Sequence, residues 1–191
     1  ELWKSDGTAS GTVMVKDISK YSGLHWTHSG QFTAVGNTLY FQATKKTSAY
    51  TDGTNGTELW KSDGTASGTV MVKDINSGSG SSFLHSLTIF GSTLYFRAND
   101  GTNGAELWKS DGTSSGTVMV KDINSGSGDS SPYYLAVFGN SLYFRAYDGI
   151  NGSELWKSDG TSSGTMMVKD INSGSGHSSP SSCLLYTSPS P

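Results

Sequence analysis

An eight-residue phrase, ELWKSDGT, occurs four times in this chain of 191 residues and constrains its fold more than any other feature. The tryptophans of the four copies are spaced by 57, 48 and 48 residues and are Trp3, Trp60, Trp108 and Trp156. A fixed period of this length is typical of proteins built from structural units that stack in tandem. We therefore interpret the phrase as part of a building unit rather than as a single chemical site.

Each unit is predicted to hold four short strands. The copy from Leu135 to Ile171 contains four β-favouring runs, LAVF, SLYFRAYD, SELWKSDG and TMMVKDI. The turn pairs Gly139-Asn140 and Asp159-Gly160, together with the cluster DGINGS, separate these runs. No run is long enough, or spaced at 3.6 residues, to be a helix. The unit is therefore predicted to be an antiparallel meander.

The predicted fold class is all-β: a β-propeller fragment of about three and a half four-stranded antiparallel blades. The runs LYF and VMV are continuously apolar, which is typical of strands buried on both faces, as in a blade between two neighbours. A β-solenoid usually has a shorter repeat. A string of sandwiches would show one polar face per strand.

The repeats resemble the bacterial ELWxxDGT repeat family, whose signature is this phrase followed by GTxxVKDI. The full signature runs over 1–18, 58–75, 106–123 and 154–171. The aromatic strand pair is also similar, more distantly, to kelch blades. The family resemblance implies a large exported or cell-surface protein with propeller-like repeats, and it implies no catalytic residues.

One tandem-repeat domain is expected over 1–182. It would consist of a half-blade at 1–18 and blades at about 32–75, 87–123 and 135–171. The tail 183–191, CLLYTSPSP, resembles translated read-through of a sequencing adapter; the alternative is a divergent terminal repeat. Because propellers close with about four to eight blades, we expect a fragment whose ends are covered by missing blades of the same chain.

Composition excludes several classes of partner. The net charge of −3 gives no reason to expect nucleic acid or an anionic membrane. No apolar run approaches the roughly 20 residues that would span a bilayer. The single cysteine, Cys183, lies in the tail, so the repeats have no disulfide framework.

The repeated aromatic residues are expected to form the core between blades, because large aromatic side chains are usually buried. They are Trp3, Trp60, Trp108, Trp156, Tyr40, Tyr95 and Tyr143. The alternative is that the tryptophans are platforms for sugar stacking.

The repeated carboxylates are predicted to be structural. They are Glu58, Glu106, Glu154, Asp74, Asp122 and Asp170. A glycosidase needs two carboxylates about 5–10 Å apart across one cleft, whereas here the same pair returns in every blade. Arg97 and Arg145 are proposed as their partners, although Gln42 takes the arginine position in the first full unit. No catalytic residue is predicted.

Metal binding has little support in the sequence. The stretch from Asp100 to Glu106 combines oxygen ligands with glycine turns, but it lacks the alternating acids and the distant Glu of an EF-hand loop. An ordinary turn is the simpler interpretation, and calcium is kept as an alternative. The histidines do not recur in register and are expected in solvated loops: His25, His28, His85 and His177.

Ligand contact is predicted at one rim. In a four-strand meander the turns after the second and fourth strands share a rim, and these turns carry most of the variation between copies. Their aromatic and histidine side chains suit sugar stacking or protein contact. The candidate ligand-binding residues are Trp26, His28, Tyr50, Tyr133, Tyr134 and Tyr147. Drift in unconstrained loops would produce the same variation.

The sequence therefore predicts a non-catalytic exported or cell-surface module for protein interaction or display. A carbohydrate-binding, lectin-like propeller is the alternative. A third reading, a propeller domain of a secreted enzyme, would require an unrepeated acid or nucleophile in a central pocket. The ligand, protein or glycan, is not identified by the sequence.

Overall fold

The computed structural model describes residues 1–18, 32–45 and 55–181, and this part of the chain contains strands and turns but no helix. The strands are β1 (Leu2–Lys4), β2 (Val13–Lys16), β3 (Thr33–Val35), β4 (Thr38–Thr44), β5 (Thr57–Ser62), β6 (Val70–Lys73), β7 (His85–Phe90), β8 (Thr93–Asn99), β9 (Ala105–Ser110), β10 (Val118–Lys121), β11 (Tyr133–Phe138), β12 (Ser141–Tyr147), β13 (Ser153–Ser158) and β14 (Met166–Lys169).

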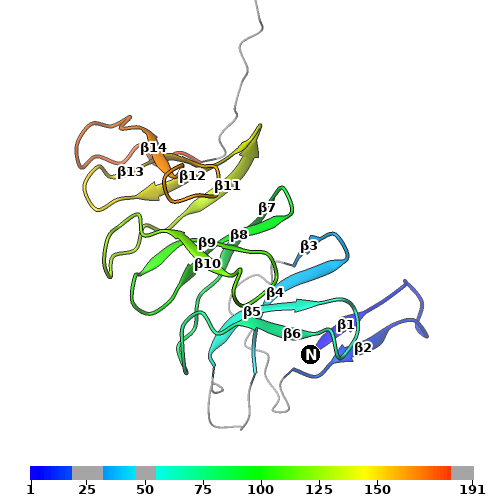
Figure 1. Cartoon of the computed structure of the whole chain (residues 1–191). Helices are drawn as coiled ribbons and strands as arrows, with labels where there is room; N and C mark the ends of the chain where they lie inside the picture. Colours follow the sequence, from blue (N-terminus) through cyan, green and yellow to red (C-terminus); the bar gives the residue numbers. More distant parts are fainter. Residues whose placement is uncertain (19–31, 46–54, 182–191) are drawn as a thin grey trace, which may run out of the picture.

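These strands form four antiparallel sheets in chain order. The first sheet is the pair β1–β2, and the second, third and fourth sheets are the meanders β3–β6, β7–β10 and β11–β14. The predicted all-β chain of four-stranded antiparallel units is confirmed. Successive sheets follow one another along the molecule (Figure 1), and the first strands of the units lie together, because β7 contacts both β3 and β11.

The SDGT part of the repeated phrase forms a self-contained turn between the third and fourth strands. In the third sheet Gly112 has a φ of 89°, and its backbone N–H donates to Ser110 Oγ at 3.0 Å. The backbone N–H and the hydroxyl of Thr113 both donate to Asp111 Oδ1, at 2.8 and 2.7 Å. Since only glycine adopts such a φ without strain, the Asp-Gly pair sets the hairpin.

The core lies between sheets and repeats with the sequence. Each sheet has a forward face, toward the next sheet, and a rear face, toward the preceding sheet. The third sheet's forward face contributes Tyr95, Leu107, Val120 and Ile123. The fourth sheet's rear face contributes Leu142, Phe144, Ala146 and Trp156 to the same core. Equivalent residues fill the two earlier interfaces. A unit is therefore buried on both faces when it has a neighbour on each side.

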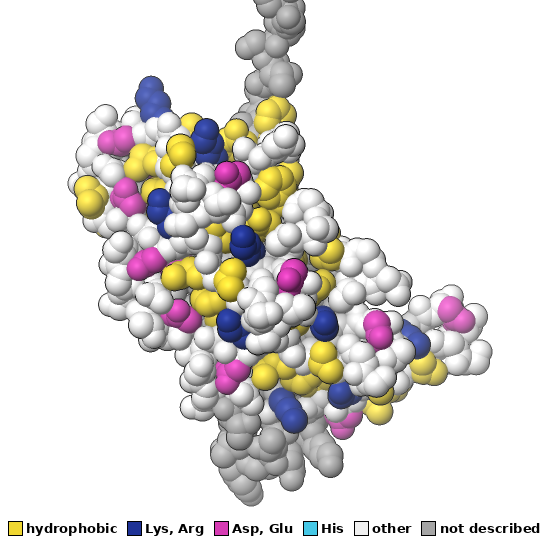
Figure 2. All heavy atoms as spheres, viewed as in Figure 1, with side chains coloured by type: hydrophobic (Ala, Val, Ile, Leu, Met, Phe, Trp, Pro, Cys, Tyr) yellow, Lys and Arg dark blue, Asp and Glu magenta, His cyan; other side chains and the backbone are white. Residues whose placement is uncertain are grey.

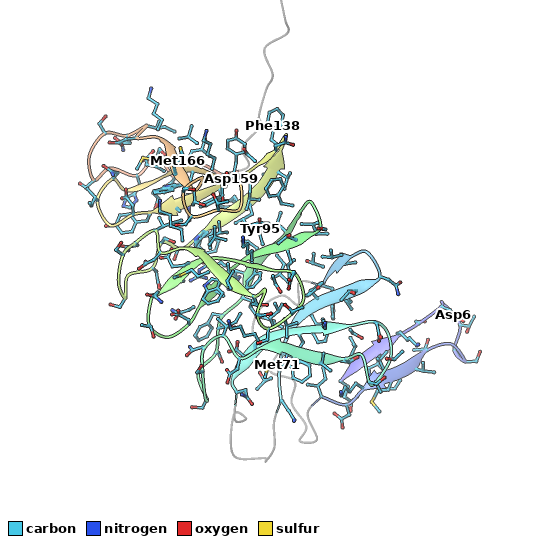
Figure 3. All side chains as sticks on the ribbon, viewed as in Figure 1. Asp6, Met71, Tyr95, Phe138, Asp159 and Met166 are labelled. Carbon is cyan, nitrogen blue, oxygen red and sulfur yellow. The ribbon has the colours of Figure 1, made fainter. Side chains whose placement is uncertain are left out.

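Polar contacts also join consecutive sheets. The lysine of each of the first three ELWK copies reaches the next unit's turn: Lys4 Nζ donates to Gly64 O at 3.0 Å, Lys61 Nζ to Gly112 O at 2.9 Å, and Lys109 Nζ to Gly160 O at 2.8 Å. Figure 3 shows Tyr95 between the third and fourth sheets, where its hydroxyl lies against Gly160. These bonds give the repeated Lys a structural role, while the positive φ and the nearby tyrosine hydroxyl account for the Gly.

The two ends of the stack are open. The fourth sheet's forward face carries Ile171, which is 53% exposed, whereas its counterpart Ile123 in the third sheet is 6% exposed. Apolar side chains consequently reach the surface along the stack (Figure 2). At the other end Trp3 lies on the rear face of the first sheet and is 54% exposed.

The units begin slightly earlier than the sequence predicts. Strands β7 and β11 start at His85 and Tyr133, two residues before the expected starts near 87 and 135. A register shift follows each start, and within it Ser86 and Tyr134 each have a φ of 57°. A β-bulge of this kind re-aims the side chains around it, which period-2 alternation does not predict.

Candidate functional site

The buried glutamates of the repeated phrase hold the connectors between sheets. Glu106 is fully buried on β9 and accepts hydrogen bonds from the backbone N–H of Ile123 at 2.9 Å and of Ser130 at 3.0 Å. The Ser130 hydroxyl adds a third bond at 2.6 Å. Since Ser130 lies in the connector to the fourth sheet, Glu106 ties the end of one unit to the start of the next.

Burial sets the ionisation of these carboxyls. It raises the pKa of Glu58 and of Glu106 to about 7, although the hydrogen bonds to each carboxyl oppose the rise. Glu154 accepts equivalent bonds from Ile171 and Ser178 and is also without exposed surface, but among the described residues no sheet follows it. Burial raises its pKa less than the hydrogen bonds lower it, so its pKa falls below the usual value. In Glu106 and Glu154 both carboxyl oxygens accept hydrogen bonds, whereas Glu58 Oε1 is buried without a hydrogen-bond partner.

The prediction that Arg97 and Arg145 pair with the repeated acids is wrong. The bonds of Glu106 go to backbone and serine donors. Both guanidinium groups instead lie over tyrosine rings, with Arg97 Cζ 5.1 Å and Arg145 Cζ 5.5 Å from the ring centroid of Tyr133. The physical reason is the direction of the Arg97 side chain. Arg97 and Tyr95 are two residues apart on β8, so both side chains lie on the forward face of the strand.

Among the repeated aromatics, Trp60, Trp108 and Trp156 are buried between sheets, as are Tyr40 and Tyr95. Two residues expected in the core lie elsewhere. Trp3 is exposed because none of the four described sheets packs against the rear face of the first sheet. Tyr143 is only half-buried because the fourth sheet's forward face is equally uncovered.

The stretch considered for calcium is an ordinary turn. Asp100 accepts hydrogen bonds from the backbone N–H groups of Thr102 and Asn103, and from Asn103 Nδ2. These bonds occupy both carboxyl oxygens, while Glu106 faces the connector. Within residues 1–18, 32–45 and 55–181, no group of three or more His, Cys, Asp or Glu side chains could hold a metal ion.

The predicted ligand rim is only partly described. We call the edge bearing residues 74–84, 99–104, 122–132, 147–152 and 170–180 the variable rim, and the opposite edge, with the SDGT turns, the DGT rim. The candidates Trp26, His28 and Tyr50 lie outside the described residues. Tyr133, Tyr134 and Tyr147 lie where β11 begins and β12 ends. The backbone N–H of Tyr147 donates to Ser130 O at 2.9 Å, which anchors the end of β12 to the connector.

Tyr133 is the centre of an arginine–tyrosine cluster that we define as His85, Arg97, Tyr133, Tyr134 and Arg145. The rings of His85 and Tyr134 lie 6.3 and 6.4 Å from that of Tyr133. Arg145 Cζ also lies 5.4 Å from the ring centroid of Tyr134. Tyr147 is a separate neighbour of His177, at 6.0 Å between rings. The structure therefore brings together two predicted ligand residues, Tyr133 and Tyr134, and two repeated arginines, Arg97 and Arg145, from two sheets.

Sequence reasoning missed the arginines and His85 as members of this site. The signal was available in the alternation of LYFRA, which places the Arg on the same face as the Tyr that enters the next interface. Pairing then puts Arg97 opposite His85 and Arg145 opposite Tyr133.

A small hollow lies beside the cluster in the described part of the chain. The hollow beside Tyr134 and Arg145 measures about 10 Å³, room for no more than one water. A larger groove of about 280 Å³ lies between the first and second sheets, lined by Trp3, Leu39 and Gly64. It lies at the open end of the stack, where no tyrosine hydroxyl approaches Gly64. A ligand at the cluster would therefore bind on the surface.

Comparison with family models, curated proteins and solved structures finds no match for this chain. Within its described part, no helix is long and apolar enough to cross a membrane.

Proposed function

We propose that the stacked sheets are blades of an open β-propeller that serves as a non-catalytic binding module of the ELWxxDGT type, exported or displayed at the cell surface. Three inter-sheet cores built from the same positions support the blade assignment. The first strands also lie side by side, as strands lining a propeller axis do.

One observation carries the binding role: next to the variable rim, aromatic side chains that differ between the copies gather with two repeated arginines. Tyr134 is 53% exposed, and Arg97, Arg145 and Tyr133 lie beside it. Apart from these two arginines, the repeated residues discussed above are used inside the fold, in cores, turns and connectors. Recognition often uses variable loops on a rigid scaffold, and exposed aromatic and arginine side chains are favoured contact residues. The partner is a protein or a glycan.

A glycan array, followed by titration of any hit, tests this function. Tyr134→Ala and Tyr147→Ala should weaken binding, while Phe138→Ala should not. Phe138 ends β11 at the DGT rim (Figure 3), so it controls for loss of an aromatic ring in the same sheet. Equal losses from all three changes would contradict the rim assignment. Turnover of any glycan would contradict the non-catalytic role.

A further inference from the structure

Two arginines share one tyrosine ring in the arginine–tyrosine cluster. Arg97 comes from β8 in the third sheet and Arg145 from β12 in the fourth, and the ring of Tyr133 lies close to both. The cluster therefore exists only where two units meet. The chain as a whole has a net charge of −3. The positive charge of the two arginines is therefore a local feature rather than part of a basic surface.

The positive charge of the cluster is not neutralised within the described residues. Neither guanidinium makes a hydrogen bond or an ion pair there, and Arg97 Nε is buried with no acceptor. Nearby acids at the variable rim are engaged in their own turns: Asp100 bonds Thr102 and Asn103, and Asp148 bonds Ile150 and Asn151. A guanidinium group that contacts a tyrosine ring keeps N–H donors for an acceptor outside the cluster.

Tyr134 adds an exposed apolar surface beside these donors. It has a φ of 57° in the bulge of β11, and its ring contacts Arg145. Ser86 adopts the same φ in the bulge of β7, so the backbone geometry belongs to the repeat, whereas the aromatic ring belongs to this unit alone. Non-glycine residues held in this region often lie at functional sites.

We propose that this cluster binds an oxyanion, a carboxylate or a sulfate ester, carried on a sugar ring that stacks on Tyr134. The guanidinium fork matches the paired oxygens of such groups. An exposed tyrosine suits the apolar face of a sugar. The shallow surface suits a polymer rather than an enclosed small molecule. This proposal rests on the proposed binding function and narrows it to acidic glycans.

Titration of the full chain with three polymers tests the chemistry: oligogalacturonate carries carboxylates, dextran sulfate carries sulfate esters, and dextran is neutral. At a fixed salt concentration near 150 mM, one or both acidic probes should bind and dextran should bind at least tenfold more weakly. Which acidic probe binds identifies the oxyanion. If neither acidic probe binds, or dextran binds equally, the oxyanion assignment is overturned. A glycan-array hit lost in Tyr134→Ala would still leave the broader binding function standing.

Variants locate the site. Arg145→Gln and Tyr134→Ala should each weaken binding of the acidic probe about tenfold. Arg145→Lys should also weaken this binding, because lysine keeps the charge but lacks the forked guanidinium group. Lys157→Gln removes one positive charge near the DGT rim of the same sheet and should change binding less than twofold. Circular dichroism and thermal melting verify that the variants remain folded. If Lys157→Gln weakens binding as much as Arg145→Gln does, the attraction is non-specific and the site is elsewhere.

Discussion

The forward faces of the third and fourth sheets carry equivalent residues, yet only one of them is covered. Val120 and Ile123 are buried against the fourth sheet, whereas Val168 and Ile171 face solvent. The sequence motif therefore specifies a surface that fits another unit, and burial follows only where a neighbour supplies the matching rear face. Repeat proteins derive much of their stability from such interfaces between neighbours.

The same comparison applies to charge. Glu106 and Glu154 accept hydrogen bonds from equivalent donors, but their pKa values move in opposite directions, up to about 7 for Glu106 and down for Glu154. Both side chains have no exposed surface, so what differs is the following sheet, which surrounds Glu106 with more protein than Glu154 has around it. A following sheet therefore changes the pKa of a glutamate even though the hydrogen-bond donors to its carboxyl stay the same.

The largest expected difference between a covered and an open position concerns tryptophan. Trp108→Ala should lower the free energy of unfolding by about 3–5 kcal/mol, the usual loss for a buried aromatic side chain. Trp3→Ala, at an exposed position, should lower it by less than about 0.5 kcal/mol. Urea denaturation followed by circular dichroism measures both. Similar losses at the two positions would mean that burial between sheets does not distinguish them.

A second difference concerns pH. The Glu106 pKa is raised from 4.5 to about 7 in the folded state, so its contribution to stability is full below pH 4.5 and is lost as the pH rises through 7. For a pKa rise of this size, linkage gives a loss of up to about 3 kcal/mol. Glu106→Gln should therefore flatten the fall in unfolding free energy between pH 5 and 8.

Glu154→Gln is the matched control for this pH dependence. Its carboxyl has a lowered pKa, so its contribution is present above the ordinary pKa and is lost only as the pH falls below it. The change should leave the slope between pH 5 and 8 as it is in the unmodified chain. If both substitutions flatten the slope equally, coverage by the next sheet does not govern the ionisation of these carboxyls.

Local features were predictable from the sequence. The hairpin at Asp159-Gly160 and the four-stranded unit follow from residues adjacent in the chain, since turn chemistry and strand alternation are short-range. The hydrogen-bonding partner of Glu106 was not predicted, because Ser130 lies in the connector to the next unit. A serine follows each of the three later glutamates, Glu58, Glu106 and Glu154, by 24 residues, and that spacing was the available signal.

The candidate site was predictable only in part, because some of its residues come from a neighbouring unit. Variation between copies pointed to Tyr133, Tyr134 and Tyr147 at the variable rim. It did not point to Arg97, which is repeated as Arg145 and joins the cluster from the neighbouring sheet. A residue can therefore belong to the repeat and still contribute to a local site, because its environment depends on the unit that follows.

Glycine offers a smaller test of coverage. Gly112 and Gly64 have φ values of 89° and 85°, so an alanine at either position meets similar backbone strain. A Cβ at Gly112 would also lie 2.3 Å from the Tyr40 hydroxyl, while at Gly64 it meets nothing within 4 Å. Gly112→Ala should therefore cost about 1–2 kcal/mol more than Gly64→Ala in urea denaturation. Equal costs would show that Tyr40 moves aside freely.

The smallest expected effect concerns association between copies of the chain. The forward face of the fourth sheet exposes Val168 and Ile171, and the first sheet presents Trp3 at the other end of the stack. Apolar surfaces that match an interface already used three times within the chain should pair between molecules. We expect reversible, concentration-dependent association in sedimentation equilibrium. Ile171→Glu should weaken it about tenfold, or ~1.4 kcal/mol, because a carboxylate would have to be desolvated at the contact.

Ile150→Glu provides the control for that experiment. Ile150 is more exposed than Ile171 but lies in the turn between β12 and β13, away from the forward-face core positions. The two substitutions change charge and hydrophobicity identically, so a purely electrostatic effect on association would appear in both. Association weakened only by Ile171→Glu would locate the contact on the forward face. A chain that stays monomeric at high concentration would instead show that the open face is stable in water without a matching unit.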